Sequence, residues 1–235
     1  MIRNPMIDKQ FTLAIFFVAL VAFHLFDSHN ASSQVAGDAQ TSSLIASDDI
    51  ESQSIFPLVS THNHAPGIVE FENGDLLVSW YRGSGERKAD DVAVWGAWKR
   101  AGESGWSEPF LMADEPGFPD CNTCMHVDAA NRLWLFWPTV IANSWESCLT
   151  RYQVSDHAAA SAGIKWDRQG VVLLKPEDFG GEATRVLDDL IVQQLPRPLP
   201  PAVAAEIQAA KERLHDKLYQ RLGWQPRCKP TVLPS

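Results

Sequence analysis

Four residues that could take part in acid–base or ion-pairing chemistry follow one apolar, strand-like segment, residues 76–81. Arg82 comes first, and Glu86, Asp90 and Asp91 follow it closely. A guanidinium group can hold a carboxylate through two parallel hydrogen bonds. A loop carboxyl group that becomes dry in a closed site can have its pKa raised enough to protonate a leaving oxygen. Arg82 could equally be a solvated surface residue, and Asp91 could cap a strand.

Histidines and cysteines could bind a metal ion, but their spacing gives little support. His62 and His64 are close in sequence, whereas His126 is distant from both. The Cys121-x-x-Cys124 motif has no second CxxC or paired histidine that would complete a zinc site. We therefore expect no metal and no cofactor.

The N-terminus has the layout of a secretory signal. Arg3 and Lys9 precede an apolar stretch, residues 11–26, and small residues follow at 31–33. A stretch of this length is short for a membrane span and suits a signal peptide. Residues 1–33 are expected to be a signal peptide or an uncleaved membrane anchor, so the protein is exported to the periplasm or the extracellular space. In residues 34–54 the apolar residues have no regular spacing, which predicts a flexible tether.

The cysteines and the net charge further limit the kinds of protein that this sequence can be. An exported chain forms disulfides by default, and its four cysteines allow three complete pairings. A structural bridge or a buried thiol is expected for Cys121, Cys124, Cys148 and Cys228. The net charge of −9 and the isoelectric point near 5.2 argue against nucleic-acid binding, which requires a basic patch.

The elements that must position these residues are short strands in a repeat. Residues 64–81 and 122–138 have the same strand–turn–strand pattern, and a third copy begins at 229–235. Asn73-Gly74 is a strong hairpin signal within the first copy. We expect strands at 68–71, 76–81, 91–98, 106–112, 123–127, 133–137, 148–154 and 171–174. Repeats of this kind are typical of a β-propeller.

The pattern changes after residue 175. Residues 182–195 and 202–222 have apolar positions at helical spacing, and a proline-rich segment separates them. Pro201 suits the first turn of a helix and Gly223 its C-terminal cap. We expect a helical hairpin inserted at 176–225. It could be a decoration on the propeller edge, a lid or a partner-binding arm.

A longer match resembles a known family. Residues 64–70, 73–80 and 91–95 resemble the first blade of the sialidase-like, BNR-repeat family, and residues 131–137 resemble its second blade. Lys229-Pro230 resembles the entry to the third blade. The segments around Trp106 and Trp166 resemble degenerate copies of the family's structural Asp-box turn. The resemblance implies an all-β fold, a partial six-bladed propeller with two blades at 55–175 and a truncated third at 226–235.

The resemblance also implies a glycan site on the propeller axis, where the innermost strands begin. In this sequence those positions are His64, Asn122 and Lys229. Sialidases use three arginines, a Tyr–Glu nucleophile pair and an acid–base aspartate. Arg82 and Asp91 match the arginine and aspartate positions. The family's Phe-Arg-Ile-Pro motif is replaced here by residues 63–66, which supply His64 instead of an arginine.

These features together predict an exported, exo-acting sialidase-like glycoside hydrolase whose substrate is a glycan, with sialic acid as one candidate sugar. The expected site has Asp91 and Arg82 as catalytic residues and His64, Glu86, Asp90, Asn122 and Lys229 as substrate-binding residues. We expect the chain to be the N-terminal part of such an enzyme and not to act alone. The alternatives are a non-catalytic glycan-binding module, and a structural or vestigial fragment or half of a ring that a second chain completes.

Overall fold

The structure is a computed structural model that describes residues 52–160, 163–195, 198–226 and 230–232. The expected signal segment and most of the tether lie outside these ranges, as do Cys228 and Lys229. None of the helices in the described ranges is long and apolar enough to cross a membrane. The chain divides into two compact units, one of Gln53–Pro176 and Lys217–Ser235, the other of Met1–Ser52 and Glu177–Asp216.

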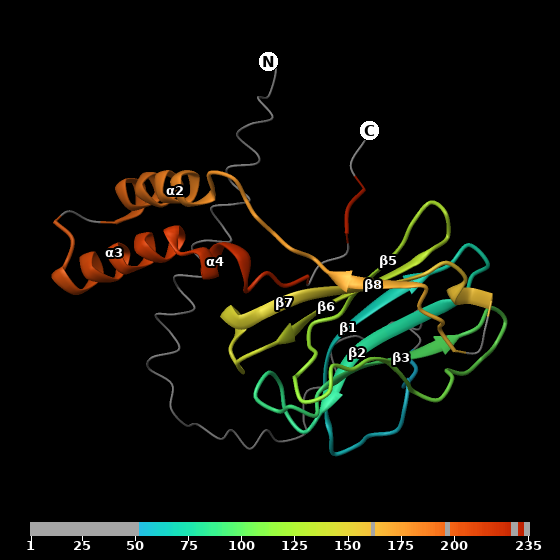
Figure 1. Cartoon of the computed structure of the whole chain (residues 1–235). Helices are drawn as coiled ribbons and strands as arrows, with labels where there is room; N and C mark the ends of the chain where they lie inside the picture. The colour runs from blue at the N-terminus through green and yellow to red at the C-terminus, as the bar shows by residue number, and fades with distance from the viewer. Residues whose placement is uncertain (1–51, 161–162, 196–197, 227–229, 233–235) are drawn as a thin grey trace. The chain divides into compact units, whose positions relative to one another are not determined.

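The first unit contains two antiparallel four-stranded sheets, each with its strands in chain order (Figure 1). The first sheet has the order β1-β2-β3-β4, with β1 His62–Glu70, β2 Leu76–Gly83, β3 Ala93–Lys99 and β4 Phe110–Ala113. The second has the order β5-β6-β7-β8, with β5 Cys124–Val127, β6 Leu133–Val140, β7 Cys148–Ser155 and β8 Arg168–Val171. Short 3-10 helices lie at Trp145–Ser147 and Ala158–Ala160.

The two sheets share one hydrophobic core. It is formed by alternate residues of their strands, because side chains in a strand point to opposite faces in turn. A hydrogen bond of 2.8 Å between the Ser79 and Thr123 hydroxyl groups joins the sheets inside this core. The first sheet contributes Val69, Phe71, Leu77, Val94, Trp98 and Met112, and the second contributes Met125, Leu133, Leu135 and Trp137.

Carboxylates stabilise the β1–β2 and β5–β6 turns. Asp75 accepts hydrogen bonds from the Ala101 backbone N–H and from Arg100. Asp128 accepts hydrogen bonds from Arg132 and from the Trp134 indole N–H. These bonds to the charged forms lower the pKa of both aspartates, and they outweigh the opposing effect of burial. Both side chains therefore stay ionised and hold the turns that set the strand registers.

The second unit, among its described residues, is a helical hairpin of α2 Phe179–Gln194 and α3 Pro201–His215. Its small core consists of Ala183, Leu187, Ile191 and Leu214. Gly180 allows the helices to approach closely, because a Cβ there would lie 2.9 Å from the Leu214 carbonyl oxygen. The expected helix 202–222 is not continuous. It breaks at Asp216, whose backbone is extended, and a short α4 Lys217–Arg221 belongs to the sheet unit.

The expectation of a mainly β fold is confirmed, because the described residues form two antiparallel four-stranded sheets, which do not close into a barrel. The last strand was expected at 171–174, whereas β8 is Arg168–Val171. Disulfides among the described cysteines are not formed. Cys121, Cys124 and Cys148 are all buried, which matches the alternative of buried thiols.

Candidate functional site

The candidate site begins at an irregularity in β1. The pairing of β1 with β2 shifts between His64 and Gly67, and Ala65 has a positive φ of 51°. A residue other than glycine in this region is strained, and such strain is concentrated at functional sites. The bulge lies directly after His62 and His64. These two histidines are two residues apart in a strand, so they lie on the same face of the sheet.

The opposite strand completes this face. Tyr81 pairs with His64 and Gly83 pairs with His62. The Tyr81 hydroxyl group lies 2.7 Å from Nδ1 of His64. Because Gly83 has no side chain, the space beside His62 is open to the loop that follows β2. A Cβ on Gly83 would lie 2.8 Å from the Val92 Cα, so this loop returns very close to the strand.

That loop brings Glu86 back over the two histidines. Its Oε1 accepts a hydrogen bond of 2.9 Å from the Tyr81 hydroxyl group. The same oxygen lies 3.1 Å from Nδ1 of His64 and 3.8 Å from Nε2 of His62. One atom from each of the three residues therefore lies within 4.8 Å of the others, an arrangement that could hold a metal ion.

Asp91 closes the loop. Its carboxylate accepts hydrogen bonds from the backbone N–H and the hydroxyl group of Ser84. These bonds lower its pKa. The Asp91 carboxylate is therefore ionised at neutral pH and already bound to Ser84, which suits its alternative role as the cap of a strand. In the structure Asp91 fixes the loop that carries Glu86.

Glu86 is also ionised. Burial raises its pKa, but the hydrogen bonds from Tyr81 and His64 and the nearby histidine charges outweigh this effect, so the pKa lies below its ordinary value. Arg87 lies 3.5 Å from the other oxygen, Oε2, and stacks over the Trp145 ring. Oε1 thus faces the histidines while Oε2 faces a cation.

Access to the site differs among its members. Tyr81 is completely buried. The side chains of His64 and Glu86 are 53% and 35% exposed, so both can reach a solute. Tyr81 therefore has no direct access to a solute, and its hydroxyl group orients His64 and Glu86 instead.

Arg82 is not brought together with this cluster. It follows Tyr81 in β2, so its side chain lies on the other face. There it donates a hydrogen bond to the Thr61 hydroxyl group and lies 5.1 Å above the Trp95 ring. Nothing in the described structure pairs it with a carboxylate.

Three other predicted site residues lie elsewhere. Asn122 is buried, and its amide donates a hydrogen bond of 2.7 Å to the Gln225 side chain. Asp90 is exposed and accepts a hydrogen bond from Asn143. Lys229 lies outside the described residues. Of the predicted set, His64 and Glu86 come together, and Asp91 supports them.

Sequence reasoning missed Tyr81 and set His62 aside. The alternation of residues in paired strands could have placed His62 and His64 on one face, but not Tyr81 opposite them, because the bulge changes the register. Sequence reasoning also missed Asp120, a fully buried carboxyl group between the sheets. Asp120 accepts hydrogen bonds from Trp137 and Thr139, and burial raises its pKa to about 6.

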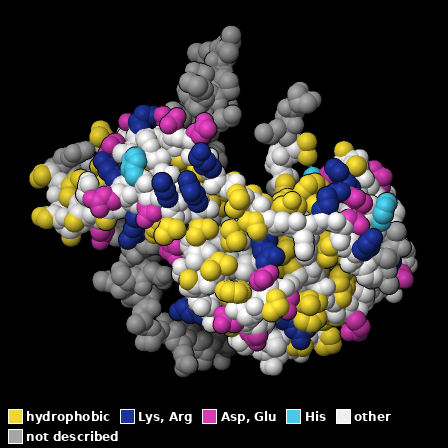
Figure 2. All heavy atoms as spheres, viewed as in Figure 1, with side chains coloured by type: hydrophobic (Ala, Val, Ile, Leu, Met, Phe, Trp, Pro, Cys, Tyr) yellow, Lys and Arg dark blue, Asp and Glu magenta, His cyan; other side chains and the backbone are white. Residues whose placement is uncertain are grey.

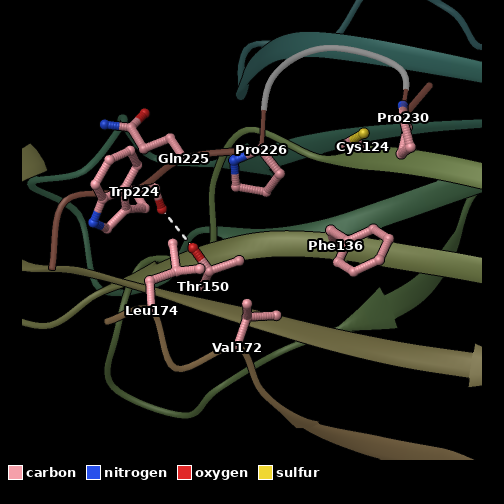
Figure 3. A pocket seen from close by; sticks show the side chains of 9 residues that line it. All are labelled: Cys124, Phe136, Thr150, Val172, Leu174, Trp224, Gln225, Pro226 and Pro230. Atoms are coloured by element: carbon pink, nitrogen blue, oxygen red, sulfur yellow. Dashed lines mark hydrogen bonds between the residues drawn. The ribbon is translucent and has the colours of Figure 1, made fainter. Parts of the chain in front are cut away.

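A second feature is an apolar groove on the second sheet (Figure 3). The side chains of Phe136, Thr150 and Val172 form its floor, and Trp224 and Pro226 form one wall. Thr150 donates a hydrogen bond to the Trp224 carbonyl oxygen. Hydrophobic side chains are also visible on the surface around β7 and β8 (Figure 2). The groove offers few polar groups to a sugar.

Comparisons with known proteins give no family assignment. Neither a protein-family model nor a curated protein matches the sequence. One similar solved structure, a protein of unknown function from Dyadobacter fermentans DSM 18053, has 13% identity and a TM-score of 0.40 over 52% of this chain and 38% of that one. Another, Hadza microbial sialidase Hz136, has 14% identity and a TM-score of 0.38 over 46% of this chain and 25% of that one. The chain spans well under half the length of either protein, and likeness at this level assigns no function.

Proposed function

We propose that this chain is part of an exported sialidase-like glycoside hydrolase and that the glycan contacts the end of β1 and β2. The observation that supports this proposal best is the cluster of His64, Tyr81 and Glu86, joined by contacts of 2.7, 2.9 and 3.1 Å. Sugars offer hydroxyl groups that both donate and accept hydrogen bonds. An exposed imidazole beside an ionised carboxylate presents the complementary groups.

The chemistry of the cluster limits the role of each residue. Glu86 is ionised, so it can accept a proton or stabilise positive charge on a sugar ring, but it cannot serve as the general acid. Asp91 has a lowered pKa as well. Glycoside hydrolysis ordinarily requires a pair of acidic or nucleophilic groups, one on each side of the glycosidic bond. The hydrolase proposal therefore needs an acid from outside this cluster.

The proposed fold supplies a place for that acid. In this proposal the two sheets are the first two blades of a six-bladed propeller, with β1 and β5 as innermost strands. The shared core and the Ser79–Thr123 hydrogen bond support their reading as neighbouring blades. A ring of about 300 residues at roughly 50 per blade would need further blades, from more of the same protein or from a second chain.

A non-catalytic glycan-binding module is the second candidate. The observation that favours it is that Glu86 and Asp91, two candidate carboxyl groups of this loop, have lowered pKa values. Binding requires no general acid, and it would need only the hydrogen-bonding groups of His64 and Glu86.

One experiment separates the two candidates. The purified full chain is incubated with a fluorogenic sialoside, and glycan binding is measured in parallel on an array of sialylated and neutral oligosaccharides. Turnover that disappears in Glu86→Gln but persists in Glu103→Gln, an exposed glutamate elsewhere, supports the hydrolase. Binding without turnover supports the module. Neither binding nor turnover would reject a glycan site at this cluster in the isolated chain.

A further inference from the structure

We propose that His62, His64 and Glu86 bind one divalent transition-metal ion of the Zn²⁺ type. The ligands would be Nε2 of His62, Nδ1 of His64 and Oε1 of Glu86. This inference does not rest on the proposed function, because it can be tested without any glycan.

The spacing of the three atoms suits a metal. Zn²⁺ binds imidazole nitrogen and carboxylate oxygen at about 2.0–2.2 Å, so tetrahedral ligands lie about 3.4 Å apart. Glu86 Oε1 lies 3.1 Å from His64 Nδ1 and 3.8 Å from His62 Nε2. Each of the three residues offers one ligand atom within 4.8 Å of the others, so metal binding requires the side chains to draw closer together.

The state of His62 supports the same conclusion. Its Nε2 atom is buried and has no hydrogen-bond partner in the described structure. A buried polar atom without a partner destabilises the folded state. A metal ion at the centre of the cluster would satisfy this nitrogen, which points towards Glu86.

Groups around the cluster would hold the ligands in place. The buried Tyr81 hydroxyl group donates to Glu86 Oε1, and Arg87 lies beside Oε2. Such outer contacts orient metal ligands and are a regular part of metal sites. Two imidazoles and one carboxylate favour Zn²⁺ and related ions over Mg²⁺ or Ca²⁺, which prefer oxygen ligands only.

Three protein ligands leave one position for water or another ligand. The exposed side of His64 and Glu86 gives that position access to solvent. Metal sites of this type are catalytic or ligand-binding, whereas structural zinc sites have four protein ligands.

The test is a Zn²⁺ titration of the full chain in competition with a chromophoric chelator, with Co²⁺ as a spectroscopic probe of coordination. We expect one tight site per chain. His62→Ala and Glu86→Gln should each weaken binding by at least about tenfold, the loss typical even of outer contacts. The matched controls are His157→Ala and Glu103→Gln, both at exposed positions.

Wild-type protein gives a second readout if a variant does not fold. Zn²⁺ should protect His62 and His64, but not His157, from carbethoxylation by diethyl pyrocarbonate, mapped by mass spectrometry. Equal affinity of wild type and His62→Ala, an equal loss in the controls, or absence of protection at both histidines would each overturn the proposal.

Discussion

Tyr81 and Arg82 are consecutive residues of β2, and their side chains lie on opposite faces of the first sheet. Tyr81 reaches His64 and Glu86, whereas Arg82 lies over Trp95. The one-residue step along a strand thus separates a cation from the cluster that it was expected to join.

Arg82→Ala should therefore leave glycan binding by the chain within about twofold of wild type, since a change of about 0.4 kcal/mol is what remote surface substitutions produce. Glu86→Gln should weaken the same binding clearly. Isothermal titration with a sialic-acid analogue measures both. A loss in Arg82→Ala as large as that in Glu86→Gln would restore Arg82 to the site.

Gly83→Ala should destabilise the sheet unit and disturb the loop that carries Glu86. The added Cβ would lie 2.8 Å from the Val92 Cα and 2.9 Å from the Asp91 carbonyl oxygen, and the backbone must move to relieve this contact. Overpacking of this kind costs about 1–3 kcal/mol of unfolding free energy, measured by urea denaturation. Gly105→Ala is the control, because a Cβ there meets nothing within 4 Å. Similar losses in both variants would contradict the close approach at Gly83.

Asp120 should make the protein less stable as pH rises from about 4 to about 6. Burial raises its folded pKa to about 6, while the unfolded group titrates near 3.9. The folded state binds the extra proton across this window, so its unfolding free energy falls there by about 3 kcal/mol. Asp120→Asn cannot titrate. The difference in unfolding free energy, wild type minus variant, should decrease across the window, and a constant difference would show that burial does not perturb Asp120.

The thiols of Cys121 and Cys148 should resist labelling in the folded chain. Burial raises the pKa of each to about 12, so the reactive thiolate is scarce at neutral pH. We expect Ellman's reagent to react with them only after guanidinium is added. Intact mass measurements before and after reduction provide the check, and a disulfide between these cysteines would contradict their free state.

Much of the fold could be predicted from local patterns. The Asn73-Gly74 turn and the alternation around it predicted β2 and the end of β1 to within two residues, since hairpin pairing is a short-range property. The start of β1 was not predicted, because the strand begins at His62 and not at residue 68. The break in the second helix could not be predicted. The apolar stripe continues through Leu218, but the chain changes partner at Asp216, from the α2–α3 core to the sheet unit.

The sequence by itself determined that the chain forms short antiparallel strands and that acidic, basic and histidine side chains gather around residues 62–91. Only the tertiary structure decided which of them meet. The bulge at Ala65 fixes the register that places Tyr81 opposite His64, and the missing side chain at Gly83 lets the loop bring Glu86 back over both histidines. These contacts depend on a backbone shift and a close approach, and neither has a signature in residue type or spacing alone.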